Sequence, residues 1–496
     1  MSAPPASPDP TMRVLRAPVS RPDTSATGRP ERPDPCADPP TVTIDPTRVM
    51  PAVTSIPGDD PVAATVPRLR SVTPAGGGAL GDGRVLAAAS ALGALGSLAG
   101  WLLAARTVAP DRLGGAVAVV AVVAVAACVA RPDRGAALVP RLPAAGRRAG
   151  RVVVRSLAAA VALGAGMGAV LAMLVPGPAA TLSALLPGPP SLGVLLVAAA
   201  TAAWAAGAVF DGVVVALDRP WWATAHVAVL VAGRIALILV VGVLLDGPPS
   251  GGVAPGGADH GWAGWVAAAW LAPVLLWMLP GSAAVAVLAR RHGRRVETAA
   301  PPRVLGPMAV ARLGATLLHQ VAPLLVVLGL GPGPGMVFFV AWQVVTAVDL
   351  AAVWMLGRAG GTSRRRLLAA VGPALALVAA GAGPLLGVFG PDYAAAADVL
   401  RVLLLGAAFR LVIVHELGAL EAAGRAWSSA RLHLYTTVPT LVVVGLSVAA
   451  VAATGLSGMS STTAGTVLLP VAAAYALVQV GNGTSTATQH ATWTRA

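Results

Sequence analysis

Twelve long apolar segments follow one another along this chain, and they constrain its fold more than any other feature. Pro/Gly turns or groups of arginine separate the segments, which lie at about residues 85–105, 114–130, 152–175, 191–217, 222–245, 262–289, 304–330, 335–357, 367–389, 396–420, 432–454 and 464–482. A helix of about 20 apolar residues is long enough to cross the hydrocarbon core of a bilayer. Composition agrees, since 56% of the 496 residues are hydrophobic and 11% are charged. The sequence therefore predicts an all-α, polytopic integral membrane protein with about twelve transmembrane helices.

The positive charges are distributed unevenly between the two sides of the predicted bundle. The net charge of +14 comes from arginine, because the chain has no lysine. If the first residues are cytoplasmic, arginines concentrate in the loops at 131–151, 290–303, 358–366 and 425–431, whereas the opposite loops hold only Arg106 and Arg112. Such asymmetry sets membrane orientation. We therefore predict a multi-pass protein of the cytoplasmic (inner) cell membrane with both termini cytoplasmic, and we exclude nucleic acid as the partner of these arginines.

The segments divide naturally into two sets of six. We predict a disordered, Pro/Arg-rich cytoplasmic tail at 1–83, because this part has no sustained apolar period. An N-terminal six-helix lobe follows at 84–289, then a basic cytoplasmic linker at 290–303, a C-terminal six-helix lobe at 304–483 and a cytoplasmic tail at 484–496. Two lobes with a substrate path between them are a common plan of transporters.

Several ionisable residues interrupt the apolar segments. A charge at the centre of a bilayer costs about 2.5–3.5 kcal/mol on insertion scales, so it faces protein or water. We predict that a cationic cavity binds an anionic ligand, because guanidinium groups bind phosphate through a planar fork of donors; its residues are Arg234, Arg312, His319 and Arg410. The other interpretation is that these groups form structural ion pairs, for example Arg234 with Asp211. Asp211 and Asp349 are also candidates for ion coupling.

Helical spacing groups these residues with other polar side chains. Positions i, i+4 and i+7 share one helix face. This spacing gives three polar stripes: Arg312, Thr316 and His319; Trp342, Thr346 and Asp349; and Tyr475, Gln479 and Asn482. Trp204, Asp211 and Asp218, which are seven residues apart, form a fourth.

Catalytic motifs are lacking. The sequence has no phosphate-binding loop with lysine, no His-rich metal motif and no paired carboxylates in an outer loop. The two cysteines, Cys36 and Cys128, indicate neither a disulfide framework nor a metal site. We therefore predict a protein that is not an enzyme and has no catalytic residue, metal or cofactor.

Two short stretches are similar to motifs of one known family of membrane proteins. The stretch FGPDYAAAADVLRVLLLGAAFRLV with the later ALEAAGRA is similar to a turn and helix at the start of the second-lobe repeat, ending in Ala423, Gly424 and Arg425. The stretch LLAARTVAPDRLGG is similar to the family's turn between spans one and two, where Ala105, Arg106, Pro110 and Gly114 match. Ala109 and Leu113 depart from that pattern, replacing a glycine and an aromatic residue.

These stretches resemble the polysaccharide flippases (of the O-antigen and teichoic acid type) in the multidrug/oligosaccharidyl-lipid/polysaccharide exporter superfamily. The resemblance implies a transporter of two six-helix bundles. Such proteins move a polyprenyl-diphosphate-linked oligosaccharide across the membrane by alternating access, so the implied partners are this anionic lipid, membrane lipids and other polysaccharide-assembly proteins. Two alternatives belong to the same superfamily, a drug or metabolite antiporter and a flippase for the peptidoglycan precursor. Another class is a non-transporting membrane scaffold that acts through the N-terminal tail. The sugar, the coupling ion and the oligomeric state do not follow from the sequence.

Overall fold

The computed structural model describes most of the chain from Gly78 to Trp493. Within this range it omits residues 131–137, 139–140, 143–144, 186–188, 190, 246–258, 293–305, 359–362, 424 and 457–463. The predicted tail therefore lies outside the described residues, apart from 78–83, and so does most of the predicted linker at 290–303.

Twelve long helices account for nearly all of the described residues, and each overlaps one of the twelve apolar segments, although α11 covers only the first part of 367–389. Six belong to the first half of the chain: α1 (Gly78–Thr107), α2 (Pro110–Ala130), α4 (Ala149–Leu174), α6 (Ser191–Ala216), α7 (Trp221–Leu245) and α8 (Asp259–His292). Six belong to the second half: α9 (Gly306–Leu330), α10 (Pro332–Arg358), α11 (Arg364–Ala380), α14 (Ala397–Ala422), α15 (Ala426–Val451) and α16 (Ala464–Trp493). No strand occurs among the residues described, so the all-α prediction is confirmed.

Nine of these helices are long and apolar enough, over their described residues, to cross a membrane. They are α1, α2, α4, α6, α7, α8, α10, α15 and α16. The described part of α9 contributes a shorter apolar helix, Thr316–Leu330, and α11 has 17 residues. The remaining helix, α14, carries Arg410, His415 and Glu416. The multi-pass membrane fold is thus shown, with nine candidate spans where the sequence predicts about twelve.

Short helices close several connections. Pro176 starts α5 (Pro176–Ser183) directly after α4, where the ring of a first-turn proline fits a helix start. Gly381 ends α11, and α12 (Ala382–Gly387) and α13 (Pro391–Ala394) lead into α14. At the chain's end α16 continues to Trp493, so residues 484–493 extend a helix where the sequence predicts a tail.

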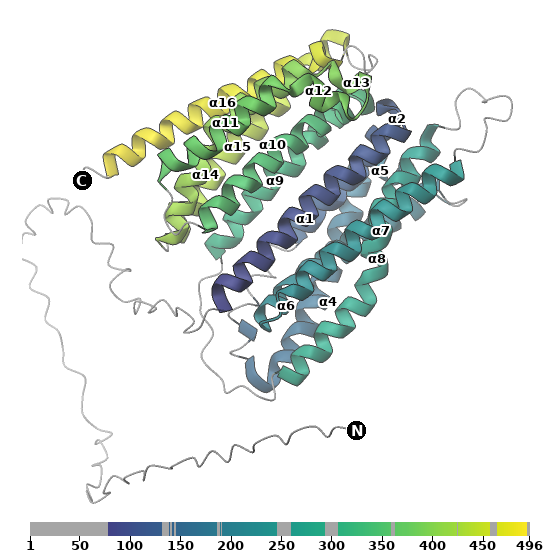
Figure 1. Cartoon of the computed structure of the whole chain (residues 1–496). Coiled ribbons are helices and arrows are strands. Elements are labelled where there is room, and N and C mark those ends of the chain that lie inside the picture. The colour runs from purple at the N-terminus through teal and green to yellow at the C-terminus, as the bar shows by residue number, and fades with distance from the viewer. Residues whose placement is uncertain are drawn as a thin grey trace, which may run out of the picture. The chain divides into compact units, whose positions relative to one another are not determined.

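The helices pair in the same way in both halves (Figure 1). In the first half α1 packs on α7, α2 on α6 and α6 on α8; in the second half α9 packs on α15, α10 on α14 and α14 on α16. Five helices of the first half, α1, α2, α6, α7 and α8, therefore have counterparts six spans later. The described helices from α1 to α16 nevertheless belong to one compact unit, in which α2 packs against both α9 and α10. The boundaries of the two predicted lobes remain a prediction.

The helix α2 is the most deeply buried of the candidate spans. Of its most apolar window, 89% is buried, and its alternating Ala and Val side chains contact both halves. Gly114 permits a close approach to α10, because a Cβ atom there would lie 2.1 Å from the carbonyl oxygen of Pro332. Arg106 adds a hydrogen bond from Nε to the Val388 carbonyl oxygen. The halves thus meet where α1 ends and α2 begins, which we call the outer end, following the predicted orientation; the opposite end is the inner end.

Candidate functional site

Arg234 lies near the middle of α7, against two tryptophan rings. Its guanidinium carbon is 4.7 Å from the ring centre of Trp270 on α8 and 5.7 Å from that of Trp204 on α6. Its Nε donates a long hydrogen bond of 3.4 Å to the carbonyl oxygen of Trp270. The faces of aromatic rings carry negative potential, so these contacts stabilise the cation.

Glycines on α1 allow this arrangement. A Cβ atom at Gly96 would lie 2.4 Å from a methyl carbon of Val231, and one at Gly93 would touch Val227. The backbone of α1 therefore lies directly on α7, one turn from Arg234.

Asp211 and His226 form a pair beside Arg234. The Nδ1 atom of His226 is 2.9 Å from Oδ1 of Asp211, and the side chain of Asp211 is 43% exposed while that of His226 is 5% exposed. The imidazole stacks on Trp277 and meets the edge of Phe210. The structural pair that the sequence suggested, Arg234 with Asp211, is therefore not the one observed, because Asp211 bonds to His226 instead.

These groups line one cavity of about 230 Å³. Trp204 and Asp211 come from α6, His226 and Arg234 from α7, and α1 and α8 close the other sides with Gly93 and Val274. The cavity thus holds a cation, a carboxylate, an imidazole and an aromatic wall at membrane depth. We call it the Arg234 cavity.

A second charged cluster lies in the other half of the chain. Arg410 on α14 forms a buried ion pair with Asp349 on α10, and the side chain of each is 5% exposed. The Nε2 atom of His319 on α9 lies 3.5 Å from the same oxygen of Asp349. The other oxygen, Asp349 Oδ1, is buried without a hydrogen-bond partner among the described residues.

Polar neighbours fix His319 in this cluster. Thr346 Oγ1 lies 3.4 Å from His319 Nδ1, and Trp342 Nε1 donates to the carbonyl oxygen of His319 at 3.1 Å. The predicted stripe of Trp342, Thr346 and Asp349 therefore faces the predicted stripe of α9. The stripe on α16 is also buried, and Gln479 Nε2 donates to Thr440 Oγ1 at 3.0 Å.

The predicted site residues thus separate into two clusters. Arg234 and Asp211 line the Arg234 cavity, whereas His319, Asp349 and Arg410 contact one another in the second half. Arg312 lies in α9, and its side chain is outside the described residues.

His226, Trp270 and Trp277 are absent from the sequence-based site. The sequence contained one indication that His226 belongs to the site. It precedes Arg234 by eight residues, about two helical turns, on the same apolar segment.

Helices of membrane-spanning length that bury ionised groups define the class of this chain as an all-α, multi-pass membrane protein. No family model matches the chain, and no curated protein matches it. The chain is similar in structure to an inward-facing multidrug resistance MATE family transporter of the MOP superfamily, with 14% identity, a TM-score of 0.49, and coverage of 84% of this chain and 95% of that one.

Two further solved structures are similar to this chain. One is a MATE protein in complex with MaL6, at 13% identity and a TM-score of 0.47, covering 84% of this chain and 96% of the other. The second is a MOP superfamily transporter from Pyrococcus furiosus, at 13% identity and a TM-score of 0.41, covering 82% and 94%.

Proposed function

We propose that this protein is a membrane transporter, a flippase that moves a polyprenyl-diphosphate-linked oligosaccharide or a related polysaccharide precursor across the cytoplasmic membrane by alternating access. One observation carries the proposal. Arg234 sits near the middle of α7 and lines a cavity, and within the described part of the chain no carboxylate is ion-paired to it.

The contacts of Arg234 stabilise its charge but, within the described residues, satisfy few of its hydrogen-bond donors. A cation at membrane depth costs about 2.5–3.5 kcal/mol, and two contacts with aromatic faces together recover about 1–4 kcal/mol, a comparable amount. The rings of Trp270 and Trp204 accept no guanidinium hydrogen bonds in the ring plane, and the bond that Arg234 donates to the Trp270 carbonyl oxygen is long at 3.4 Å. A diphosphate headgroup would satisfy the remaining donors through charge-assisted hydrogen bonds.

The size of the Arg234 cavity suits a headgroup. At about 230 Å³, it is smaller than the roughly 300–1,000 Å³ of sites that enclose drug-sized ligands. We infer that the diphosphate occupies this cavity while the sugar and the lipid tail lie outside it. Arg410 already forms an ion pair with Asp349. We therefore propose that in this conformation Arg410 stabilises the second half and does not bind the substrate.

Asp211 and His226 supply a titratable pair in the same cavity. Protonation of His226 would neutralise Asp211 and so remove the repulsion between this carboxylate and an incoming phosphate. We therefore propose that Asp211 couples transport to a proton.

The test is transport of a fluorescent polyprenyl-diphosphate disaccharide in proteoliposomes, followed by its accessibility to an impermeant quencher. Arg234→Gln removes the cation at similar size, and we expect initial rates to fall about tenfold or more, the weight of a charge-assisted hydrogen bond. The matched control is Arg401→Gln, an exposed arginine on α14 that pairs with Asp398, and it should transport normally. Normal transport by Arg234→Gln would exclude the proposed role.

A second candidate, a drug or metabolite antiporter, is favoured by the titratable groups that both clusters contain. His226 with Asp211 and His319 with Asp349 are suited to exchanging a substrate for a proton. The same vesicles distinguish the two functions: proton-driven movement of a small organic cation, with no movement of the lipid-linked disaccharide, would establish the antiporter.

The scaffold hypothesis makes a different prediction. Deletion of residues 1–82 should leave the transport rate nearly unchanged if the helical bundle carries the activity. A scaffold that acts through the tail would lose its cellular function with that deletion, and its purified form would move neither substrate.

A further inference from the structure

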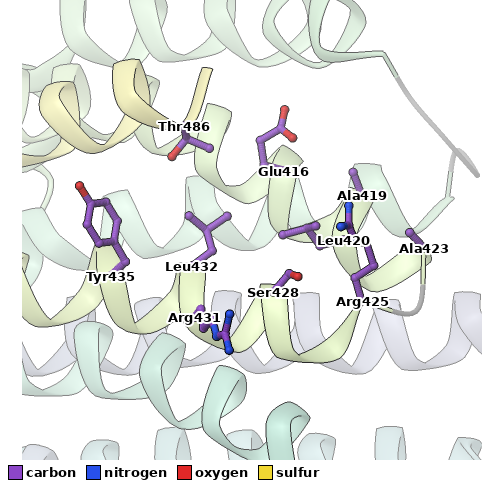
Figure 2. A pocket seen from close by; sticks show the side chains of 10 residues that line it. All are labelled: Glu416, Ala419, Leu420, Ala423, Arg425, Ser428, Arg431, Leu432, Tyr435 and Thr486. Carbon is purple, nitrogen blue, oxygen red and sulfur yellow. The ribbon is translucent and has the colours of Figure 1, made fainter. Parts of the chain in front are cut away.

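A second cavity opens between the inner ends of α14 and α15, beside the last turns of α16 (Figure 2). Its volume is about 530 Å³, and it shares no lining residue with the Arg234 cavity. Figure 2 shows residues of α14 at the upper right and residues of α15 below and to the left, with Thr486 of α16 at the upper left. We call it the inner cavity.

The lining of the inner cavity is apolar on its walls and charged at several points. Ala419, Leu420 and Leu432 supply apolar surface, while Arg425 and Arg431 add two positive charges. Such a combination suits an amphiphile that carries an anionic group.

One acidic side chain also lines this cavity. Glu416 carries a negative charge, so two arginines and one glutamate leave the lining with a net charge of +1. His415 lies beside this carboxylate, with Nδ1 3.4 Å from Glu416 Oε1. The net balance still favours an anion at the arginine side of the cavity.

The N-terminus of α15 also favours binding of an anionic group. The helix starts at Ala426, directly after Arg425, and the residue at its cap makes no side-chain hydrogen bond to the first turn. Backbone N–H groups at a helix start have no partner inside the helix, and the helix dipole makes this end positive. Phosphate groups bind to such ends. Ser428, in this first turn, also lines the cavity.

We propose that the inner cavity binds the phosphate-bearing headgroup of an amphiphile from the inner leaflet. Arg425 and Arg431 pair with the phosphate oxygens, Ser428 and the first N–H groups of α15 donate hydrogen bonds, and Leu420 and Leu432 contact the first methylene groups. The assignment to the inner leaflet follows from the orientation that the arginine distribution predicts. Headgroup binding here is separate from the transport proposed for the Arg234 cavity.

Binding is tested with the full-length protein in detergent, using dihexanoyl phosphatidate as the probe in titration calorimetry. We expect one phosphatidate per chain. Arg431→Gln should weaken binding about tenfold, as loss of one charge-assisted interaction does. The control is Arg365→Gln, an exposed arginine at the start of α11 that does not line the inner cavity, and its affinity should equal that of the wild type.

Two results would overturn the proposal. One is unchanged affinity in Arg431→Gln; the other is an equal loss in Arg365→Gln, since that would reflect only the general charge of the inner surface. If Arg431→Gln does not give folded protein, Arg425→Gln takes its place with the same expectations.

Titrations with two other compounds test whether the site requires both an anionic group and an apolar chain. Dihexanoyl phosphatidylcholine, which has no net charge, should bind at least about tenfold more weakly than phosphatidate; equal binding would contradict the requirement for an anion. Inorganic phosphate should bind weakly and compete with phosphatidate, because it lacks the apolar contact.

Ala419→Trp fills the apolar wall without removing charge. It should therefore abolish phosphatidate binding and leave inorganic phosphate unaffected, and unchanged phosphatidate binding would show that the amphiphile does not occupy the cavity. Loss of phosphatidate binding in Arg431→Gln with normal transport would support this site and leave the Arg234 proposal untouched.

Discussion

Two arginines at membrane depth are stabilised in different ways. Arg410 lies against the carboxylate of Asp349, whereas Arg234 lies against the ring of Trp270. A carboxylate neutralises the guanidinium and accepts a hydrogen bond from it, while an aromatic face attracts the charge without accepting hydrogen bonds in the ring plane. Within the described part of the chain, Arg234 donates only one hydrogen bond, from Nε to the Trp270 carbonyl oxygen. This difference is the basis for the structural role that we propose for Arg410 and the binding role that we propose for Arg234.

The buried pair of Arg410 and Asp349 gives a stability prediction. Asp349→Asn removes one charge and leaves Arg410 buried without its counterion, which should lower the free energy of unfolding by about 3–5 kcal/mol. The measurement is equilibrium unfolding of the detergent-solubilised protein by a denaturing detergent.

The exposed pair of Arg401 and Asp398 is the matched control. Its side chains are 48% and 74% exposed, so Asp398→Asn should cost about 0–1 kcal/mol. If Asp349→Asn lowered the free energy of unfolding as little as Asp398→Asn, the result would contradict a buried ion pair. It would indicate instead that Arg410 faces a water-filled cavity in the second half.

At the residue scale, the sequence indicates which side chains are special and leaves their partners open. Helical spacing correctly groups Trp342, Thr346 and Asp349 on one face. It does not give the rotation of one helix about its axis relative to the next, so it suggested Arg234 for Asp211, where the structure has His226. The packing of neighbouring helices decides which side chains pair, and the residue spacing within one helix gives no information about that packing.

Close contacts between helices depend on small residues at a few positions. Gly96 lets α1 lie on α7, and Gly114 lets α2 lie on the start of α10. Lipid tails are as apolar as leucine side chains, so helices associate in membranes through close packing rather than through the hydrophobic effect. Glycine permits the nearest approach of two backbones.

Gly114→Ala tests the approach of α2 to α10. The added Cβ atom would lie 2.1 Å from the carbonyl oxygen and 2.3 Å from the Cα atom of Pro332. Because these are backbone atoms, α10 itself must move, and we expect a loss of about 1–3 kcal/mol in the free energy of unfolding, as for other overpacked sites. Denaturing-detergent titration again provides the measurement.

Gly166→Ala is the control for helix propensity. No atom lies within 4 Å of a Cβ built at Gly166 on α4. This substitution should be neutral or stabilise by up to about 1 kcal/mol, because alanine favours a helix more than glycine does. A Gly114→Ala protein as stable as Gly166→Ala would mean that the two helices are further apart than the structure shows.

Element by element, the apolar segments predicted the long helices well. Bilayer thickness and the rise per residue fix the length of a span, so the pattern of apolar runs carries this information directly. The short helices α12 and α13 were not predicted, because they depend on local turns at Gly381 and Gly390. Arg410, His415 and Glu416 lower the mean hydropathy of α14, and they are also the residues that suggest a functional role for this helix.

The whole molecule repeats one pattern of helix pairing, with a charged cluster in each half. Arg234, Asp211 and His226 occupy the first half, and Arg410, Asp349 and His319 the second. The sequence predicted two sets of six spans from the basic loop between them, but it could not predict how the sets meet. The contact between the two sets depends on α2. Its Ala- and Val-rich sequence does not differ from that of other apolar segments, so it gave no indication of this contact.

Alternating access requires the contact at the outer end to open. In this conformation that end is closed: Arg106 bonds to the Val388 carbonyl oxygen, and Gly333 at the start of α10 lies against Asp111 of α2. A transporter must separate these groups to release its substrate outward. A covalent link between α2 and α10 at this point should therefore stop transport.

The link can be made with Asp111→Cys and Gly333→Cys in a chain whose Cys36 and Cys128 are replaced by serine. A Cβ atom at Gly333 would lie 3.8 Å from the Cα atom of Asp111, so the two backbones are close enough for a disulfide, in which the Cβ atoms are about 3.5–4.5 Å apart. We expect the pair to oxidise readily, to abolish transport of the lipid-linked disaccharide, and to recover on reduction, while each single cysteine variant transports under both conditions. Full transport by the oxidised double variant, with the disulfide verified by mass spectrometry, would show that this end stays closed throughout the cycle, and the substrate would then need a path that does not separate α2 from α10.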